Sequence, residues 1–99
     1  MNMQALMRQA QNLQKEMMKS KEEIDKTEFI GESSLVKVTM KGTREVISVE
    51  ISQDSDLSSE DLEMLQDMIL LAVNDANKKI DDFTEKKMGK FGNSMPGLF

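Results

Sequence analysis

The sequence predicts a two-layer α+β fold, in which a small antiparallel sheet of two or three strands is covered on one face by two long helices. Three observations predict it. Apolar residues recur every three or four positions near both ends of the chain, they alternate with polar residues in the middle, and a glycine-containing turn divides the alternating region. The 99 residues suit one small domain. We expect a single domain over 1–88, followed by a mobile tail over 89–99 that contains glycine and proline.

The first element is expected to be a helix over 2–26. Good helix formers dominate this segment, and no glycine or proline occurs before Gly31. The apolar side chains have the spacing of a heptad-like helical seam, and they are Met3, Leu6, Ala10, Leu13, Met17 and Ile24. Basic side chains lie on the opposite face within about 40° of one another, and they are Arg8, Lys15, Lys19 and Lys26.

The middle of the chain is expected to form strands. Residues 28–30 are expected to form a short strand or an extended segment that leads into the sheet. In residues 35–40 and 45–51 apolar and polar side chains alternate, and a hairpin turn at 41–44 separates these two segments. We expect one face to be buried, carrying Val36, Val38, Met40, Ile47, Val49 and Ile51. The other face is expected to be wet, carrying Lys37, Thr39, Ser48 and Glu50.

The second helix is expected over 59–88. Ser58 is a typical N-cap, and acidic residues follow it in the first turn, where they complement the helix dipole. Apolar residues recur at helical spacing at Leu62, Leu65, Ile69, Ala72, Ala76, Ile80 and Phe83. Further apolar residues widen this stripe at the start, so we expect the first half of the helix to be the more buried. Asn74 and Asp75 are expected to face solvent or to form hydrogen bonds at an interface.

The composition argues against catalysis. The chain has no His and no Cys, so the commonest general base, thiolate nucleophile and zinc ligands are missing. We expect no enzyme activity, no metal, no cofactor and no small-molecule substrate. No apolar run approaches the roughly 20 residues of a membrane span, and residues 1–11 lack the features of a secretory signal. We therefore expect a cytoplasmic protein without a membrane partner.

The net charge of -5 hides an uneven charge distribution. Residues 1–21 carry four basic side chains and one acid, 54–67 carry six acids and no base, and 78–99 carry five lysines and three acids. Both ends are basic and the middle is acidic. The overall acidity therefore does not exclude binding of nucleic acid at the ends of the chain.

The length of the helices predicts a homodimer. At about 1.5 Å per residue each helix reaches about 35–45 Å, longer than a small domain of about 30 Å. A sheet this small cannot cover both apolar seams, so we expect a second copy to do so. The expected interface consists of Leu6, Ala10, Leu13, Met17, Leu65 and Ile69.

Several segments together resemble one protein family. They are residues 6–14, 35–39, 46–51 and above all 60–76 (EDLEMLQDMILLAVNDA), with Lys87-Met88 and Met95-Pro96-Gly97 near the end. Their order and spacing are similar to those of the YbaB/EbfC family of bacterial nucleoid-associated proteins. The resemblance implies a helix, three antiparallel strands and a helix, forming an intertwined homodimer whose projecting helices bind duplex DNA. It also implies a role in nucleoid organisation and gene regulation, without catalysis.

The resemblance has one visible departure. The family usually carries a glycine-rich stretch before the strand at 35–39, whereas this chain has only Gly31-Glu32-Ser33-Ser34. The connection is therefore expected to be shorter and less flexible than in the family.

We expect DNA phosphates to be contacted by seven basic residues, namely Arg8, Lys15, Lys19, Lys78, Lys79, Lys86 and Lys87. A charged outer face is also normal for any amphipathic helix, and lysines near a helix C-terminus stabilise its dipole. Arg8 is the only residue of the first helix able to make a bidentate guanine contact, so weak sequence preference is expected.

The methionine content leaves an alternative function open. Five of the ten methionines lie in the first 18 residues, and Met-rich helices can serve as protein-interaction adaptors or chaperone-like modules.

Overall fold

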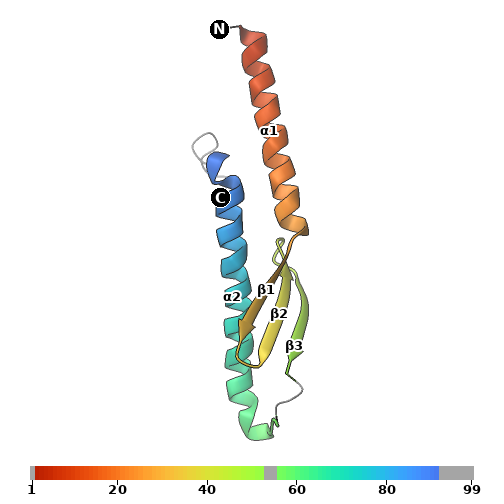
Figure 1. Ribbon diagram of the computed structural model, residues 1–99, viewed down its shortest axis with the longest axis vertical. Coiled ribbons are helices and arrows are strands. Elements are labelled where there is room, and N and C mark those ends of the chain that lie inside the picture. Colours follow the sequence, from red (N-terminus) through yellow and green to blue (C-terminus); the bar gives the residue numbers. More distant parts are fainter. Residues whose placement is uncertain (1, 53–55, 92–99) are drawn as a thin grey trace.

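The computed structural model describes residues 2–52 and 56–91, which form an elongated body of 70 × 19 × 15 Å. One long helix, α2, packs along a small sheet, whereas α1 extends away from one end of it, so that α1 and the start of α2 point to opposite ends of the molecule (Figure 1). The elements in chain order are α1 (Met3–Lys26), β1 (Glu28–Ser33), β2 (Val36–Lys41), β3 (Val46–Ile51), the 3-10 helix η1 (Ser59–Asp61), α2 (Leu62–Met88) and the 3-10 helix η2 (Gly89–Phe91). The predicted α+β fold class and the overhang of both helices are confirmed, but the expectation that both helices cover the sheet is wrong, because α2 alone packs on it and α1 packs on α2 beyond its end.

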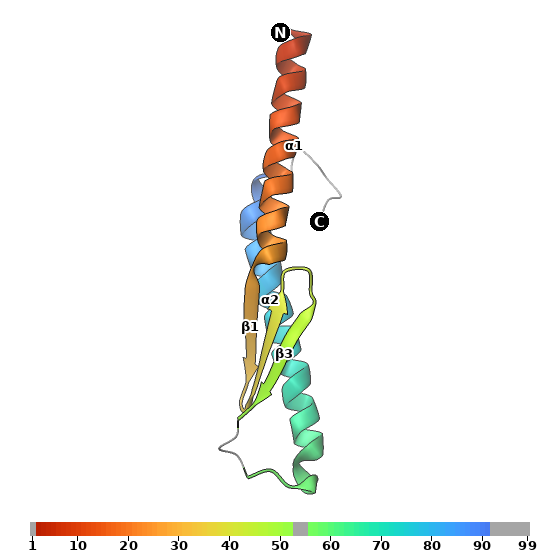
Figure 2. The same cartoon turned by 90° about the vertical axis from the view of Figure 1, so that its right-hand side faces the viewer.

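The sheet is antiparallel with strand order β1-β2-β3, and α2 packs across β1 and β2 (Figure 2). Its inner face buries Phe29 from β1 and alternate residues of β2. The outer face is wet, as predicted, and its register places acids opposite lysines: Lys37 lies between Glu32 and Glu50. Opposite charges on neighbouring strands attract each other, so these charged pairs stabilise the outer face while it stays in contact with solvent.

The prediction that Ile47, Val49 and Ile51 are buried is wrong for the single chain. These side chains and Val46 are between 37% and 46% exposed. Val49 and Ile51 do pair with the buried Val38 and Val36, and a register shift between Thr39 and Met40 brings Val46 opposite Met40. The strand therefore has its apolar side chains exposed because α2 packs over β1 and β2 and leaves β3 uncovered.

The expected burial of the first half of α2 is also wrong. Within that half only Ala72 is buried, whereas Ala76, Ile80 and Met88 are buried in the second half. Four large apolar side chains of the first half are exposed, namely Leu62, Met64, Leu70 and Leu71. The cause is geometric, since the start of α2 runs beyond the end of the sheet (Figure 1).

The junction of the two helices forms a separate part of the core. Met17 and Ile24 of α1 pack with Met88 and Phe91, and Leu13 lies against this cluster. Phe91 is only 2% exposed, so ordered structure continues three residues past the expected domain end at 88. The remainder of the expected tail, residues 92–99, lies outside the described residues.

The short connection between β1 and β2 is a tight turn. Ser34 has a φ of 51°, a left-handed conformation, and β2 begins two residues later at Val36. Gly31, which belongs to the shortened glycine-poor segment, lies inside β1 and pairs with Val38. It therefore serves packing against α2 and does not supply a flexible loop.

Candidate nucleic-acid interface

The N-terminal part of α1 projects from the rest of the molecule. Residues 2–12 are all exposed, and contact with α2 and η2 starts at Leu13 and Met17 (Figure 1). The helix is capped at its start, because the side-chain Oδ1 of Asn2 accepts a hydrogen bond of 2.9 Å from the backbone N–H of Gln4. Such a cap satisfies one otherwise unpaired donor of the first turn.

The predicted basic residues of α1 lie on this projecting helix or just below it. Arg8, Lys15 and Lys19 are exposed. Among residues 2–52 and 56–91, none of the three forms an ion pair with an acid. Their positive charge is thus available to a polyanion, which gains affinity through release of counterions.

The predicted basic residues of α2 divide into two kinds. Lys87 is engaged, because its Nζ lies 2.8 Å from Oε2 of Glu23 on α1 and 5.7 Å from the ring centroid of Phe83. Lys79 is engaged as well, by Asp75 at 3.2 Å and by the carbonyl oxygen of Ile30 at 2.6 Å. These two lysines hold α2 to the rest of the fold.

Lys78 and Lys86 are exposed, and within the part of the chain that the structure describes they have no ion pair. Both lie in the second half of α2, whose end reaches only part of the way along α1 (Figure 1). The structure therefore does not bring them to the projecting tip that carries Arg8.

Two carboxylates have lowered pKa values because of these contacts. The pKa of Glu23 is lowered by its hydrogen bond and charge interaction with Lys87. The pKa of Asp75 is lowered chiefly by the backbone N–H of Glu32, which donates a 3.0 Å hydrogen bond, and then by Lys79. Asp75 and Lys79 thereby satisfy backbone groups on the outer edge of β1, so Asp75 forms its hydrogen bonds within the chain.

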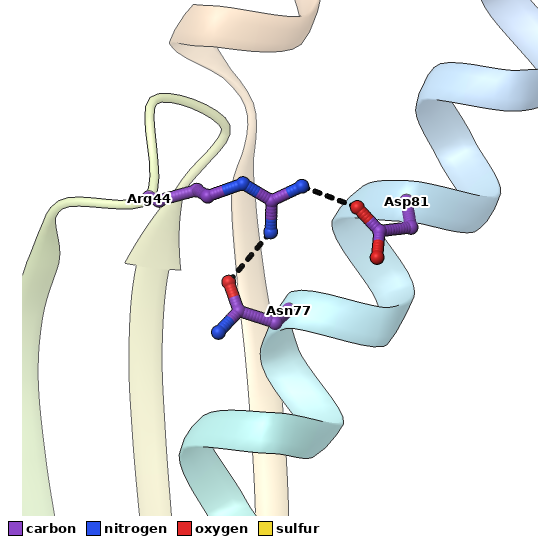
Figure 3. Close-up of polar contacts among 3 residues, drawn as sticks. All are labelled: Arg44, Asn77 and Asp81. Atoms are coloured by element: carbon purple, nitrogen blue, oxygen red, sulfur yellow. Dashed lines mark hydrogen bonds and ion pairs between the residues drawn. The ribbon is translucent and has the colours of Figure 1, made fainter. Parts of the chain in front are cut away.

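The second arginine of the chain has a structural role that the sequence did not predict. Arg44 follows the β2–β3 turn and has a φ of 75°, which is unusual for a residue with a long side chain. Its guanidinium donates a 2.7 Å hydrogen bond to Oδ1 of Asn77 and pairs with Asp81 (Figure 3). No sequence signal joins residues so far apart in the chain. Arg44 therefore fastens the hairpin to α2.

An acidic region occupies the end of the molecule opposite the tip of α1. Between 56 and 67 the acids are Asp56, Glu60, Asp61, Glu63 and Asp67, without a basic residue. They surround η1 and the start of α2, at the bottom of Figure 1. Ser58 occupies the predicted N-cap position, where the Asp61 carboxylate accepts hydrogen bonds from its backbone N–H at 2.9 Å and from its hydroxyl at 3.2 Å. The molecule is thus electrically polarised along its long axis.

The described residues contain no group of three or more potential metal-ligating side chains. They also contain no helix that is both long and apolar enough to cross a membrane. The exposed surface of α1 does provide a row of guanidinium and ammonium groups along one continuous helix. Such groups bind phosphate oxygens through charge-assisted hydrogen bonds.

Comparison with known proteins decides the family. The model of the YbaB/EbfC DNA-binding family matches residues 1–95. The chain belongs to this family. As a YbaB/EbfC protein it is a member of a DNA-binding family and not of an enzymatic one.

The sequence similarity to known YbaB/EbfC relatives covers almost the whole length of this chain. It is 49% identical over 98 residues to a nucleoid-associated protein of Lactococcus lactis, covering 97% of this chain and 98% of that one. It is 45% identical over 99 residues to a nucleoid-associated protein of Enterococcus faecalis, covering 98% and 94%. The crystal structure of an uncharacterised protein from Helicobacter pylori has the same fold, with a TM-score of 0.68 at 23% identity, covering 96% of this chain and 99% of that one.

The residues predicted for a dimer interface lie in different environments in this YbaB/EbfC chain. Leu6 and Ala10 are exposed on the projecting part of α1. Leu13 and Met17 already pack within the chain against Met88 and Phe91. Leu65 and Ile69 are half-buried beside the cluster of Val36, Val38 and Ala72. Most of the exposed large apolar side chains of the described residues lie on β3, on the first half of α2 and on the tip of α1.

Proposed function

We propose that this protein is a nucleoid-associated homodimer that binds duplex DNA through the basic face of α1. The observation that carries the proposal is the exposed, capped, projecting helix with Arg8, Lys15 and Lys19 on one face. In this role it contributes to nucleoid organisation and to the regulation of gene expression. The names of the relatives from Lactococcus lactis and Enterococcus faecalis support the association with the nucleoid.

The distribution of charge supports an end-on approach to DNA. The acidic residues around η1 repel phosphates, whereas the tip of α1 at the other end attracts them (Figure 1). Complementary charge orients an encounter even where the net charge is unfavourable. DNA therefore meets the tip of α1 first.

The chemistry of the basic face of α1 supports weak sequence preference. Lysine ammonium groups contact phosphates without reading base edges, and Arg8 alone on α1 has the planar group that matches guanine. The aromatic residues Phe29, Phe83 and Phe91 are packed in the core and offer no stacking platform for single strands. Duplex backbone contact is the mode that these residues favour.

The proposed dimer is supported by the uncovered apolar surface. β3 and the first half of α2 lie at the same end of the molecule and expose eight large apolar side chains in total (Figure 1). Exposed apolar patches of this kind mark protein–protein contacts in soluble proteins. A second copy packing there covers β3 and leaves both α1 tips free to bind DNA.

The test is titration of random-sequence duplex DNA at several salt concentrations. If about four to six phosphates are contacted, log affinity falls against log salt with a slope of about -3.6 to -5.4. The variant Arg8→Glu with Lys15→Glu is expected to weaken binding and to make the slope shallower by about 1.8 or more. Far-UV circular dichroism checks that the variant stays folded.

The matched comparison uses neutral substitutions, Lys37→Gln with Lys41→Gln against Arg8→Gln with Lys15→Gln, because both pairs lose the same charge and no acid is placed opposite Glu28, Glu32 or Glu50 on the wet face of the sheet. The variant on the sheet is expected to retain most of the affinity and the full salt slope. Equal loss in both variants would mean that only net charge matters and that α1 is not the contact surface. Binding that does not respond to salt, or capture of specific proteins that survives nuclease treatment, would favour the adaptor alternative.

A further inference from the structure

The apolar seam of α1 continues past the point where the rest of the described chain covers it. Leu13, Met17 and Ile24 contact α2 and η2. Toward the N-terminus the same stripe carries Met3 and Leu6, which are 71% and 42% exposed, and Ala10, which is also exposed. The covered part of the seam therefore ends where η2 ends.

The chain leaves the described structure beside this bare part of the seam. α2 runs antiparallel to α1, and its C-terminal end together with η2 lies about midway along α1 (Figure 1). Phe91, the last described residue, is buried against Met17 and Leu13. Residues 92–99 thus start at the lower edge of the uncovered stripe, and α2 points toward the tip of α1.

We propose that residues 92–99 pack along the bare seam of α1 formed by Met3, Leu6 and Ala10 of the same chain. The segment reads Gly-Asn-Ser-Met-Pro-Gly-Leu-Phe and contains no charged side chain. Its three large apolar residues, Met95, Leu98 and Phe99, match the chemistry of the seam. Met3 on the helix side is unbranched and flexible, so it adapts readily to such side chains.

The segment is long enough to reach. Eight residues extend to at most about 26 Å at about 3.3 Å per residue. The seam from Leu13 to Met3 covers about 15 Å at the helical rise of about 1.5 Å per residue. The tether also holds the segment at a local concentration in the millimolar range, which favours it over a separate copy. Pro96 and the two glycines disfavour a further helix and suit an extended segment.

This packing is independent of the proposed DNA contact. The seam lies roughly opposite Arg8 and Lys15 on the helix, so residues 92–99 on the seam leave the basic face uncovered. The consequence is mechanical: a single projecting helix would be stiffened along its otherwise bare side. DNA binding through the basic face therefore does not depend on this packing.

Disulfide trapping tests the packing cleanly because the chain has no cysteine. The variant Leu6→Cys with Leu98→Cys is expected to form a link within one chain under mild oxidation. The matched control is Gln4→Cys with Leu98→Cys, since residue 4 is two positions away but about 160° around the helix. We expect the 6–98 link to form at least about ten times faster than the 4–98 link, because a disulfide requires the two Cα atoms within about 7 Å.

Any of three other results of the disulfide trapping would contradict the proposal. Equal rates for the two pairs mean that residues 92–99 have no preferred face. A link between chains formed by Leu6→Cys alone means that a second copy covers the seam. A link between chains that requires both cysteines means that the segment packs on the partner's α1.

Hydrogen exchange provides a second measurement without cysteines. Removing residues 92–99 is expected to speed amide exchange over 3–12 about tenfold or more, with exchange over 72–80 unchanged. The milder variant Leu98→Asp is expected to act in the same direction. Unchanged exchange over 3–12 in both variants would overturn the proposal.

Discussion

At the scale of single residues, Gly31 decides how closely β1 approaches α2. A Cβ at this position would lie 2.0 Å from the carbonyl oxygen of Ala72 and 2.5 Å from the backbone nitrogen of Ala76. Both neighbours are backbone atoms of α2, so no side chain can rotate away. Only glycine allows this contact between strand and helix, and Ala72 and Ala76 on the helix are small for the same reason.

Gly31→Ala is therefore expected to destabilise the protein by about 3 kcal/mol, the cost of forcing packed elements apart. Urea unfolding followed by circular dichroism measures the change. Gly89→Ala is the control, because a Cβ at residue 89 would meet no atom within 4 Å and the φ of -59° suits alanine. It is expected to be neutral or slightly stabilising. Equal stability of Gly31→Ala and wild type would contradict the close approach.

At the scale of elements, one ion pair joins the two helices outside the apolar core. Glu23 of α1 and Lys87 of α2 pair at 2.8 Å next to the cluster of Met17, Ile24, Met88 and Phe91. The pair is partly exposed, so its contribution is small and is reduced by salt.

The lowered pKa of Glu23 predicts a pH dependence. Because the folded state favours the charged carboxylate, its stabilisation is present above the ordinary pKa of glutamate and is lost as the pH falls through the lowered value. Glu23→Gln is expected to be slightly less stable than wild type at neutral pH, with the difference vanishing once the pH falls below that lowered pKa. Urea unfolding at several pH values tests this.

Glu16→Gln is the control for the pH experiment, since it removes the same charge from α1 at an exposed position that forms no ion pair among the described residues. Its stability relative to wild type is expected to change little with pH. A stability difference for Glu23→Gln that persists at low pH would mean that the ion pair is not its source.

At the scale of the whole molecule, the single chain is too slender to cover its own apolar surface. The body is 70 Å long but only 19 × 15 Å across, and α2 covers two of the three strands. The edge of β1 is closed by Asp75 and Lys79, whereas β3 is an edge strand with exposed apolar side chains. Such an edge invites a partner.

We therefore expect Val49→Lys to weaken the proposed homodimer, because a charge on β3 must be desolvated in the interface. Sedimentation at micromolar concentration is expected to show the mass of two chains for wild type and of one chain for the variant. Ile30→Lys is the control, as Ile30 is 44% exposed on β1, whose edge α2 already occupies. A single-chain mass for wild type would reject the dimer.

Local patterns predicted the elements closely. The helix expected over 2–26 is Met3–Lys26, the strands expected at 35–40 and 45–51 are Val36–Lys41 and Val46–Ile51, and the Ser58 cap precedes η1 and α2. These features depend on helical period, strand alternation and capping, which are properties of neighbouring residues. The exposed basic face of α1 was predictable for the same reason, because it lies on one continuous helix.

The sequence by itself determined the elements, the family and the separation of basic ends from an acidic middle. Only the tertiary structure decided which side chains are covered and which lysines are already engaged. Apolar periodicity marks both a covered and a bare strand, so it could not show that α2 leaves β3 exposed. Likewise Lys79 and Lys87 look the same as Lys78 and Lys86 in sequence, but Ile30 and Glu23, which lie 49 and 64 positions away along the chain, hold the first two in place. Contacts between distant segments depend on how whole elements pack, which no local pattern records.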